Sequence, residues 1–300
     1  MKLLITGAWN CTAEQLEQIR AMGHEVAFMQ YEQDALPVDP SWVEGLVCNG
    51  LFLHHDIGLF KNLRLIQLTS AGFDRVPMEE VQRRGITIYN ARGVYGIPMA
   101  EFAVAGVLQI YKQSRFFAQN QQKHQWMKHR GLLELWGKQV CIVGCGNIGQ
   151  ECAKRFSAFD CQVVGVDVFT AELPHISKMY LVEQLEQVLP KSDVVVLTLP
   201  LTEQTKHLMN EKTLSKMKKG AVLVNIARGG VVSTEDLTRA LQNGLGGAVL
   251  DVFEEEPLPE NHPLWDMENV LITPHNSFVG DHNSLRLGNV ILENLSRECR

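Results

Sequence analysis

Short apolar runs alternate with amphipathic segments along the chain, and this alternation predicts its elements. Runs rich in Val, Ile and Leu are typical of buried strands, whereas apolar residues spaced three and four apart indicate helices. In the first block the pattern predicts strands at Lys2–Thr6, Glu25–Phe28, Val47–Leu53, Leu65–Leu68 and Ile86–Tyr89, and helices at Thr12–Met22 and Met78–Arg84. This β-α-β order predicts a parallel sheet with helices on both faces.

A second block follows a long helical pattern at Met99–Gln119, which Pro98 opens, as proline suits a first helical turn. Gly93 and Gly96, just before it, indicate a hinge. The block predicts strands at Lys138–Val143, Gln162–Val166, Asp193–Thr198, Ala221–Asn225, Gly247–Asp251 and Val270–Thr273, and helices at Ile148–Ala158, Leu181–Leu189, Glu211–Met217, Thr234–Asn243 and Asp281–Arg297. The sequence therefore predicts an α/β protein with two doubly wound parallel-sheet domains.

Composition narrows the class of protein. A length of 300 residues favours two domains over one. The net charge of -6 argues against a nucleic-acid partner, because readers of duplex DNA usually carry a basic face. No apolar run reaches the roughly 18 residues of a membrane helix, and the apolar stretch in MKLLITGAW is too short for a secretory signal. We therefore expect a cytoplasmic protein without a membrane or nucleic-acid partner.

The seven cysteines do not indicate a metal site. Four of them, Cys141, Cys145, Cys152 and Cys161, lie close together, but their spacing fits no usual zinc pattern and no CxxC pair is present. We interpret them as reduced thiols, several of them in core strands, and expect no metal.

The segment VGCGNIG, which ends the strand predicted at Lys138–Val143, matches the G-x-G-x-x-G pattern. Its glycines have separate roles in a dinucleotide site: Gly144 permits the tight turn, Gly146 lets the backbone approach a pyrophosphate, and Gly149 allows close packing of helix on strand. Asn147 and Ile148 begin the next helix, whose free N–H groups favour phosphates. The match is specific because a strand precedes it and a helix follows it.

Asp167 ends the next strand, at about the 20-residue distance expected of a ribose-binding acid. A carboxylate there accepts hydrogen bonds from the adenosine ribose hydroxyls and repels a 2′-phosphate. The residues that follow, Val168, Phe169 and Thr170, include no arginine. The sequence therefore predicts NAD rather than NADP as the cofactor.

Three candidates for chemistry lie after late strands, where doubly wound sheets place their sites. Arg228 can grip a carboxylate and polarise a carbonyl. His275 is a natural proton donor near neutral pH, and Glu256 is a carboxylate partner for it. Taken singly, each is more often an ordinary surface or turn residue.

Six parts of the sequence contain the glycine motif, Asp167 and these three candidates: Gly144–Gly149, Asp167, Leu199–Thr202, Asn225–Gly230, Asp251–Pro257 and Thr273–His275. Taken together, they resemble the successive signatures of the D-isomer-specific 2-hydroxyacid dehydrogenases. Two earlier segments, Thr69–Asp74 and Asn90–Val94, resemble the family's substrate loop and hinge.

The resemblance implies a discontinuous flavodoxin-like substrate domain, residues 1–96 plus 276–300, and a Rossmann NAD-binding domain, residues 97–275. It implies that the cleft between them holds the substrate and that hinge closure excludes water. The helix at Met99–Gln119 and the stretch around Trp126 resemble the family's dimer-forming arm, so we expect a homodimer.

The resemblance also implies a reaction: NADH reduces a 2-oxo acid to a D-2-hydroxy acid, with Arg228, Glu256 and His275 as the catalytic set. Arg228 would hold the carboxylate, His275 would donate the proton and Glu256 would support the imidazolium. The substrate-binding residues implied are Ser70, Ala71, Gly72, Val94, Arg228 and His275. The cofactor-binding residues implied beyond the glycine loop and Asp167 are Thr198, Pro200, Thr205, Ala227, Arg228, Asp251 and His275.

Several alternatives stay open. The substrate is not determined, and glyoxylate, hydroxypyruvate, pyruvate, bulky 2-oxo acids and 3-phosphoglycerate all fit. Phe278 and Tyr95 depart from the family's pattern and are expected to alter the pocket, whereas Glu256 argues against the formate dehydrogenase branch. His54 and His55 are candidates for substrate contact, although polar residues at the end of a strand more often have no such role. A non-enzymatic NAD-sensing interaction protein of the same fold is the alternative function.

Overall fold

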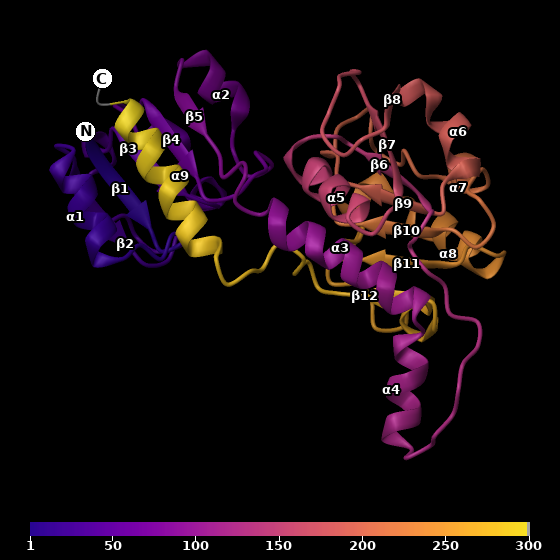
Figure 1. Ribbon diagram of the computed structural model, residues 1–300. Helices are drawn as coiled ribbons and strands as arrows, with labels where there is room; N and C mark the ends of the chain where they lie inside the picture. Colours follow the sequence, from indigo (N-terminus) through magenta and orange to yellow (C-terminus); the bar gives the residue numbers. More distant parts are fainter. Residues whose placement is uncertain (299–300) are drawn as a thin grey trace. The chain divides into compact units, whose positions relative to one another are not determined.

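The computed structural model describes residues 1–298 and divides into two compact units (Figure 1). The first comprises Met1–Tyr95 together with the C-terminal segment from Gly280, and the second comprises Gly96–Val279. The end of the predicted substrate domain, Cys299 and Arg300, lies outside the described residues. Each unit is built on a parallel sheet.

The first unit contains a five-stranded sheet in the order β2-β1-β3-β4-β5. Its strands are β1 (Lys2–Thr6), β2 (Glu25–Met29), β3 (Gly45–Cys48), β4 (Leu65–Leu68) and β5 (Thr87–Tyr89). Every neighbouring pair is parallel. This is the flavodoxin-like strand order, in which the chain direction across the sheet reverses between β1 and β3.

The α-helices in the described part of the first unit are α1 (Ala13–Ala21), α2 (Met78–Arg83) and α9 (Asn283–Arg297). Helix α9 lies along the sheet beside α1, although almost the whole chain separates them in sequence (Figure 1). Its apolar stripe of Leu287, Ile291 and Leu295 packs in one core cluster with Leu3 and Ile5 of β1. Burial of this stripe therefore fixes the last helix to the first strand.

The second unit contains a seven-stranded sheet in the order β12-β11-β10-β9-β6-β7-β8. Its strands are β6 (Gln139–Val143), β7 (Gln162–Asp167), β8 (Lys178–Leu181), β9 (Val194–Leu197), β10 (Val222–Asn225), β11 (Gly247–Leu250) and β12 (Val270–Ile272). All the pairings are parallel, and the order is that of a Rossmann sheet with one strand added. The predicted fold class is confirmed.

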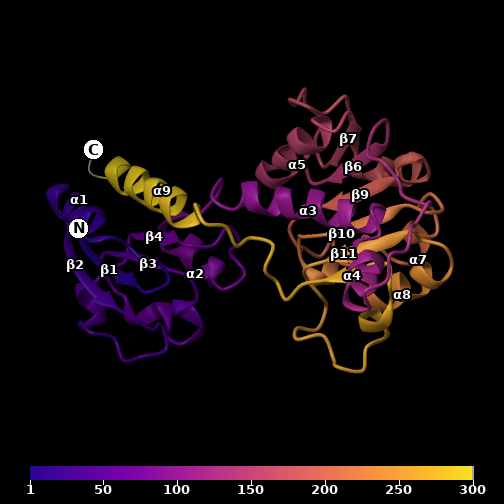
Figure 2. The same cartoon turned by 60° about the horizontal axis from the view of Figure 1, so that its bottom comes forward.

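The helices of the second unit cover both faces of its sheet, except α4, which extends from the end of α3 (Figure 2). They are α3 (Gly96–Tyr111), α4 (Ser114–Gln122), α5 (Asn147–Ser157), α6 (Leu185–Val188), α7 (Glu211–Leu214) and α8 (Thr234–Gln242). Side chains of α6, α7 and α8 share a core with alternate residues of the strands, such as Val195 and Leu197. Helix α3 packs on α5 and on β10 to β12, where Gly106 lies against Val249.

Three predicted elements are wrong in their extent, and in the first of them a side chain from another loop ends the strand. The strand predicted at Val47–Leu53 ends at Cys48, since the Glu32 carboxylate accepts the N–H groups of Asn49 at 2.7 Å and Gly50 at 2.6 Å. Leu51–Leu53 then form a 3-10 turn instead of a strand.

The helix predicted at Met99–Gln119 is broken in two. Gln113 adopts a left-handed backbone with φ 53, which an α-helix cannot propagate, and the chain changes direction between α3 and α4. The helix predicted at Leu181–Leu189 is also wrong at its start, because Lys178–Leu181 forms the edge strand β8. No residue of that strand is buried, and its short apolar run Met179–Leu181 continues into the apolar positions of the segment that follows, so it does not stand out as a strand.

Within residues 1–298, no helix is both long enough and apolar enough to cross a membrane. The same residues contain no group of three or more His, Cys, Asp or Glu side chains placed to hold a metal ion. Six cysteines in this range are free thiols, and burial raises the pKa of Cys145 to about 12.

Candidate active site at the carboxyl edge of the second sheet

Six strands of the second sheet end in a single row of residues. The successive partners in that row are Val166, Val143, Leu197, Asn225, Leu250 and Ile272. After each residue of this row, one to three positions further along the chain, comes a residue predicted for the site. In the same order these are Asp167, Gly144, Thr198, Arg228, Asp251 and His275. The glycine loop follows β6 and His275 follows β12, and these strands are four positions apart in the sheet. Because neighbouring strands are about 4.8 Å apart, the two are separated by roughly 20 Å along this edge.

Two glycines of the glycine motif are required by the packing of the protein itself: Gly144 in the loop after β6 and Gly149 in the first turn of α5. Gly144 has φ +93, and a Cβ there would lie 2.8 Å from the backbone nitrogen of Leu199. A Cβ on Gly149 would lie 2.1 Å from the carbonyl oxygen of Gly144. A side chain at either position would force the backbone apart, as the motif predicts.

Gly146 differs, because a Cβ there would meet no protein atom within 4 Å. It is the N-cap of α5, and no side chain caps that helix. The first N–H groups of the helix therefore face an open space, which a side chain at position 146 would partly fill. Asn147 and Ile148 form the first turn of the helix, and the Asn147 side chain lies beside Gly96. These features fit the pyrophosphate of a dinucleotide.

Asp167 lies directly beside this loop. Its carboxylate accepts the N–H of Cys145 at 2.6 Å and that of Val168 at 2.7 Å. The residue is only partly buried, so its oxygens keep capacity for further donors. On the other side of the loop, Thr198 donates from Oγ1 to the Gly144 carbonyl at 2.5 Å. Both residues therefore hold the loop in place as well as flanking it.

The loop after β9 is closed by hydrogen bonds of its own. Thr205 Oγ1 donates to the Pro200 carbonyl at 2.7 Å, and the Thr202 N–H donates to the same hydroxyl oxygen at 2.7 Å. Thr205 is half-buried and Pro200 is exposed. Both predicted cofactor residues of this segment thus belong to one compact turn beside the glycine loop.

Arg228 follows β10 in a loop that Asn225 organises. The buried Asn225 side chain accepts the Ala227 N–H at 3.1 Å and donates to the Arg228 carbonyl at 3.2 Å. Arg228 itself donates to the Ala227 carbonyl at 2.8 Å and is partly buried. A Cβ on Gly229 would lie 1.8 Å from the Phe253 carbonyl oxygen, so this loop packs directly on the one that leads to Glu256.

Asp251 organises the turn that carries His275. Its carboxylate, in a residue only 1% exposed, accepts the Thr273 hydroxyl at 2.6 Å and the N–H groups of Asn276 at 2.7 Å and Ser277 at 2.9 Å. The His275 N–H donates to the Asp251 carbonyl at 2.8 Å. The described contacts of Asp251 thus hold both ends of the turn.

His275 and Glu256 are brought together by the fold. His275 Nδ1 lies 2.9 Å from Glu256 Oε2, and the two side chains are 45% and 38% exposed. Glu256 Oε1 accepts the Phe253 N–H at 3.0 Å, which orients the carboxylate toward the ring. Because Nδ1 is engaged with Glu256, Nε2 is the ring nitrogen through which His275 can exchange a proton with a ligand. Phe278 packs edge-on against the ring at 6.3 Å between centroids.

The predicted substrate residues of the first unit also lie at a carboxyl edge. After β4, Ser70 Oγ donates to the Gly72 carbonyl at 3.0 Å, and the Ala71 carbonyl accepts from Asn90 Nδ2 at 2.6 Å. The Ala91 N–H donates to the Ser70 carbonyl at 2.9 Å, which ties this loop to the loop after β5.

Val94, also predicted to bind substrate, is fully buried in the first unit's core. Its N–H donates to the Ala91 carbonyl at 3.2 Å, and its carbonyl accepts Arg286 Nε at 2.8 Å. Of the two histidines weighed as substrate contacts, His55 is engaged with the Glu32 carbonyl at 2.9 Å, and His54 is exposed.

Two polar residues important to this edge were missed from the sequence. Asn225 and Thr273 fix the Arg228 and His275 turns, but each reads locally as an ordinary polar strand end. The local signal they share is a polar residue at the end of an apolar strand or directly after it.

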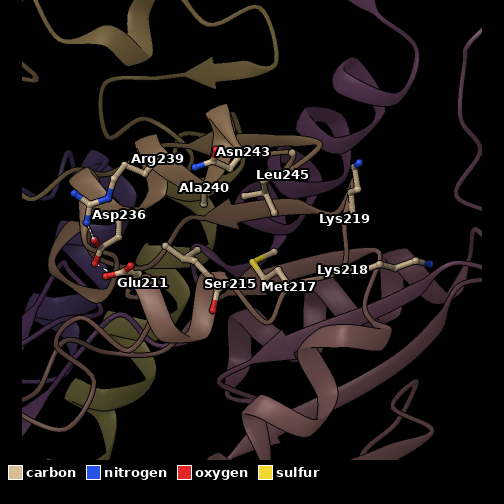
Figure 3. Close-up of a pocket in the computed structure, with 12 residues that line it drawn as sticks. Glu211, Ser215, Met217, Lys218, Lys219, Asp236, Arg239, Ala240, Asn243 and Leu245 are labelled. Carbon is tan, nitrogen blue, oxygen red and sulfur yellow. Dashed lines mark hydrogen bonds and ion pairs between the residues drawn. The ribbon is translucent and has the colours of Figure 1, made fainter.

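A separate hollow of about 420 Å³ lies between α7 and α8 (Figure 3). Glu211 faces Asp236 and Arg239 at one end of it, and Lys218 and Lys219 lie at the other. None of the predicted site residues lines this hollow. The candidate site is therefore defined by its loops and not by this cavity.

Comparison with known proteins agrees with this geometry. Residues 104–277 match the family model described as the D-isomer specific 2-hydroxyacid dehydrogenase, NAD binding domain. A glyoxylate reductase of Thermofilum pendens is 40% identical over 225 residues, which are 71% of this chain and 65% of that protein.

Solved structures extend the likeness to both units. A D-isomer specific 2-hydroxyacid dehydrogenase family protein from Aeromonas salmonicida aligns with a TM-score of 0.84 and 30% identity, over 99% of this chain and 94% of that one. A D-lactate dehydrogenase from Aquifex aeolicus, complexed with NAD and lactic acid, aligns with a TM-score of 0.77 and 26% identity, over 97% and 93%. The chain therefore belongs to the D-isomer specific 2-hydroxyacid dehydrogenase family, whose NAD-binding domain its second unit contains.

Proposed function

We propose that this protein reduces a 2-oxo acid to the corresponding D-2-hydroxy acid with NADH. The observation that carries the proposal is the contact of 2.9 Å between His275 Nδ1 and Glu256 Oε2, at the same sheet edge as the glycine loop. An imidazole held by a carboxylate is an efficient proton donor to a developing alkoxide.

The chain's own residues would act as follows. Bound NADH supplies the hydride that reduces C2 of the acid. His275 releases the proton on Nε2 to the C2 oxygen, and Glu256 stabilises the imidazolium before that transfer. The Arg228 guanidinium grips the substrate carboxylate and polarises the C2 carbonyl. The N–H groups of Ala71 and Gly72 are proposed to bind the other side of that carboxylate.

The cofactor assignment depends on three parts of the edge. The open space at Gly146 and the uncapped start of α5 suit the pyrophosphate. Asp167 suits the ribose hydroxyls and disfavours a 2′-phosphate, so NADH is proposed as the preferred coenzyme. Thr198, Pro200, Thr205 and Asp251 complete the proposed set.

The test is an assay of purified protein with a panel of 2-oxo acids, each with NADH and with NADPH. The panel would contain glyoxylate, hydroxypyruvate, pyruvate, 2-oxoisocaproate and phenylpyruvate. Oxidation of NADH above background with at least one acid would support the proposal. For every acid except glyoxylate, whose product is achiral, chiral chromatography should show a D product. Tight NADH binding without turnover of any acid would instead support an NAD-sensing interaction protein.

We also propose a homodimer formed through the segment from Ser114 to Trp136, here called the arm. Trp126 is 97% exposed and Trp136 is 73% exposed, and an exposed aromatic surface is typical of an interface. Helix α4 and the chain after it project from the second unit (Figure 1). Sedimentation equilibrium should give twice the chain mass, and Trp126→Ala should shift the mass toward the monomer. A monomeric wild-type protein would refute the proposal.

A further inference from the structure

A second histidine–glutamate pair lies in the loops beside the proposed catalytic one. His207 Nε2 is 2.6 Å from Glu254 Oε1, although 47 residues separate them in sequence. The side chains are 42% and 33% exposed. Glu254 stands two positions before Glu256 in the same loop, so one segment of four residues, 253–256, meets both histidines.

This second pair joins three loops of the carboxyl edge. The His207 N–H donates to the Gly230 carbonyl at 2.8 Å, which fixes it to the loop after Arg228. Glu254 Oε2 accepts the Thr234 N–H at 2.6 Å, at the start of α8. His207 itself follows the turn closed by Thr205, so the pair connects the proposed cofactor turn to the segment that carries Glu256.

Segment 253–256 is anchored in the core at its start, where Phe253 is buried, but its three glutamates are exposed. Gly229 approaches the Phe253 carbonyl and the Glu254 nitrogen closely, with an added Cβ only 1.8 Å and 2.6 Å from them. Glu255 and Glu256 beyond that contact are exposed. The Glu254 carboxylate, bonded to His207 and Thr234, therefore anchors the exposed part of the segment between Phe253 and Glu256.

Glu254 is held in its ionised form. Burial alone would raise the pKa of its carboxyl group, but hydrogen bonds from Thr234 and His207 outweigh burial and lower that pKa below its usual value. An ionised carboxylate makes the stronger, charge-assisted type of hydrogen bond to both donors.

We propose that His207 is a positioning residue for the reaction: through Glu254 it holds segment 253–256 so that Glu256 presents Oε2 to His275 Nδ1. This inference rests on the proposed function for its effect on turnover. Catalytic groups need placement within about 0.5 Å, and a shift near 1 Å can cost about a hundredfold in rate. A loosened segment would therefore lower kcat while the residues that bind substrate and NADH stay in place.

The experiment compares His207→Ala and His207→Gln with a matched control, His175→Ala. His175 also has a left-handed backbone, with φ 64 against 49 for His207, and also bonds through its ring, to Ser157 at 3.1 Å. His207→Ala should lower kcat roughly tenfold to a hundredfold and change KM for the 2-oxo acid less than about twofold. His207→Gln should recover most of kcat, because its amide N–H can donate to Glu254. His175→Ala should keep wild-type kcat.

A second readout does not require turnover. The ¹⁵N chemical shifts of the His275 ring report the fraction of the tautomer protonated at Nδ1, which the Glu256 contact favours. That fraction should fall in His207→Ala and stay at the wild-type value in His207→Gln and His175→Ala. Equal tautomer fractions in wild type and His207→Ala would overturn the positioning role, as would a His207→Gln variant no more active than His207→Ala. If the wild-type protein turns over none of the acids, the proposed function fails, and the tautomer measurement still decides the role of His207.

Discussion

The two edges of the seven-stranded sheet use their polar groups differently. At the carboxyl edge, α5 begins without a side-chain cap, Gly146 faces open space, and His275 is 45% exposed. At the amino edge, the Asp193 side chain is only 15% exposed and accepts Lys218 Nζ at 2.7 Å and the Gln139 N–H at 3.0 Å. A Cβ on Gly246 would lie 2.1 Å from the Gly220 carbonyl oxygen, so even the turns there are closed by protein.

This difference teaches how to separate a binding edge from a structural one. Polar groups that stabilise the fold have their partners within the protein, because an unpartnered buried group costs free energy. Groups that bind a ligand must instead have donors or acceptors that the protein does not already use. Substitutions of groups that face open space at the carboxyl edge should therefore change activity more than stability. Substitutions of groups already engaged within the protein should do the reverse, as at the amino edge.

The largest effect is expected from His275→Ala. Removal of the proton donor should lower kcat/KM for the best 2-oxo acid by about 10² to 10⁴. The Kd for NADH and the Tm should change little, because the ring is half-exposed and packs mainly on Glu256 and Phe278. Steady-state kinetics, with His175→Ala as the control at a similar backbone, would check this. Wild-type turnover in the variant would reject His275 as the acid.

The next prediction compares two glycines of the same motif, Gly149 and Gly146, which should differ in whether substitution affects stability or NADH binding. Gly149→Ala should destabilise the protein by about 3 kcal/mol or more, since its Cβ would lie 2.1 Å from the Gly144 oxygen. Gly146→Ala meets no protein atom within 4 Å and should keep the wild-type Tm. It should nevertheless weaken NADH binding by about tenfold or more, which corresponds to about 1.4 kcal/mol. Thermal unfolding and NADH fluorescence titration would measure both, and unaltered NADH affinity in Gly146→Ala would contradict the assigned pyrophosphate site.

A smaller effect is expected at Asp167, which both flanks the loop and bonds to it. Asp167→Ala should reduce the preference for NADH over NADPH by about tenfold, because a charged acceptor contributes about 1.5 to 3 kcal/mol to a hydrogen bond. Asp167→Asn is the control that keeps an oxygen for the Cys145 N–H but loses the charge. It should relax the preference similarly with a smaller loss of stability. Unchanged ratios of kcat/KM for the two coenzymes in both variants would exclude the ribose role.

The smallest effect is expected at the amino edge and depends on pH. Burial alone would raise the pKa of Asp193, but Lys218 and the Gln139 N–H outweigh burial and lower it. A carboxyl with a lowered folded pKa stabilises the protein above its unfolded pKa of about 3.9 and loses that contribution as the pH falls through the folded value. Asp193→Asn should therefore cost about 1 kcal/mol at pH 7.

That cost should shrink in acid, where the wild-type carboxyl is also protonated. Urea unfolding between pH 3 and pH 7 would follow the difference, and kcat at pH 7 should equal that of the wild type. A constant difference across this range, or a loss of turnover without a loss of stability, would contradict the structural role of Asp193.

Much of the fold followed from local patterns. Strands such as Lys2–Thr6 and Leu65–Leu68 were predicted at their observed bounds, because continuous burial leaves an apolar run that is easy to recognise. The edge strand Lys178–Leu181 was missed because it is only partly buried. The left-handed break at Gln113 was missed as well, since nothing in the surrounding sequence requires it.

The sequence by itself determined the strand–glycine–helix motif and the acid that follows it at Asp167, because these depend on residues close together in the chain. It predicted the late Arg, Glu and His only through the resemblance of several segments taken together. Only the tertiary structure decided that His275 meets Glu256 and that His207 meets Glu254. It also decided that Asp251 faces inward to hold the His275 turn. The physical reason is that the order of strands in a parallel sheet, which side-chain packing selects, sets which strand ends become neighbours.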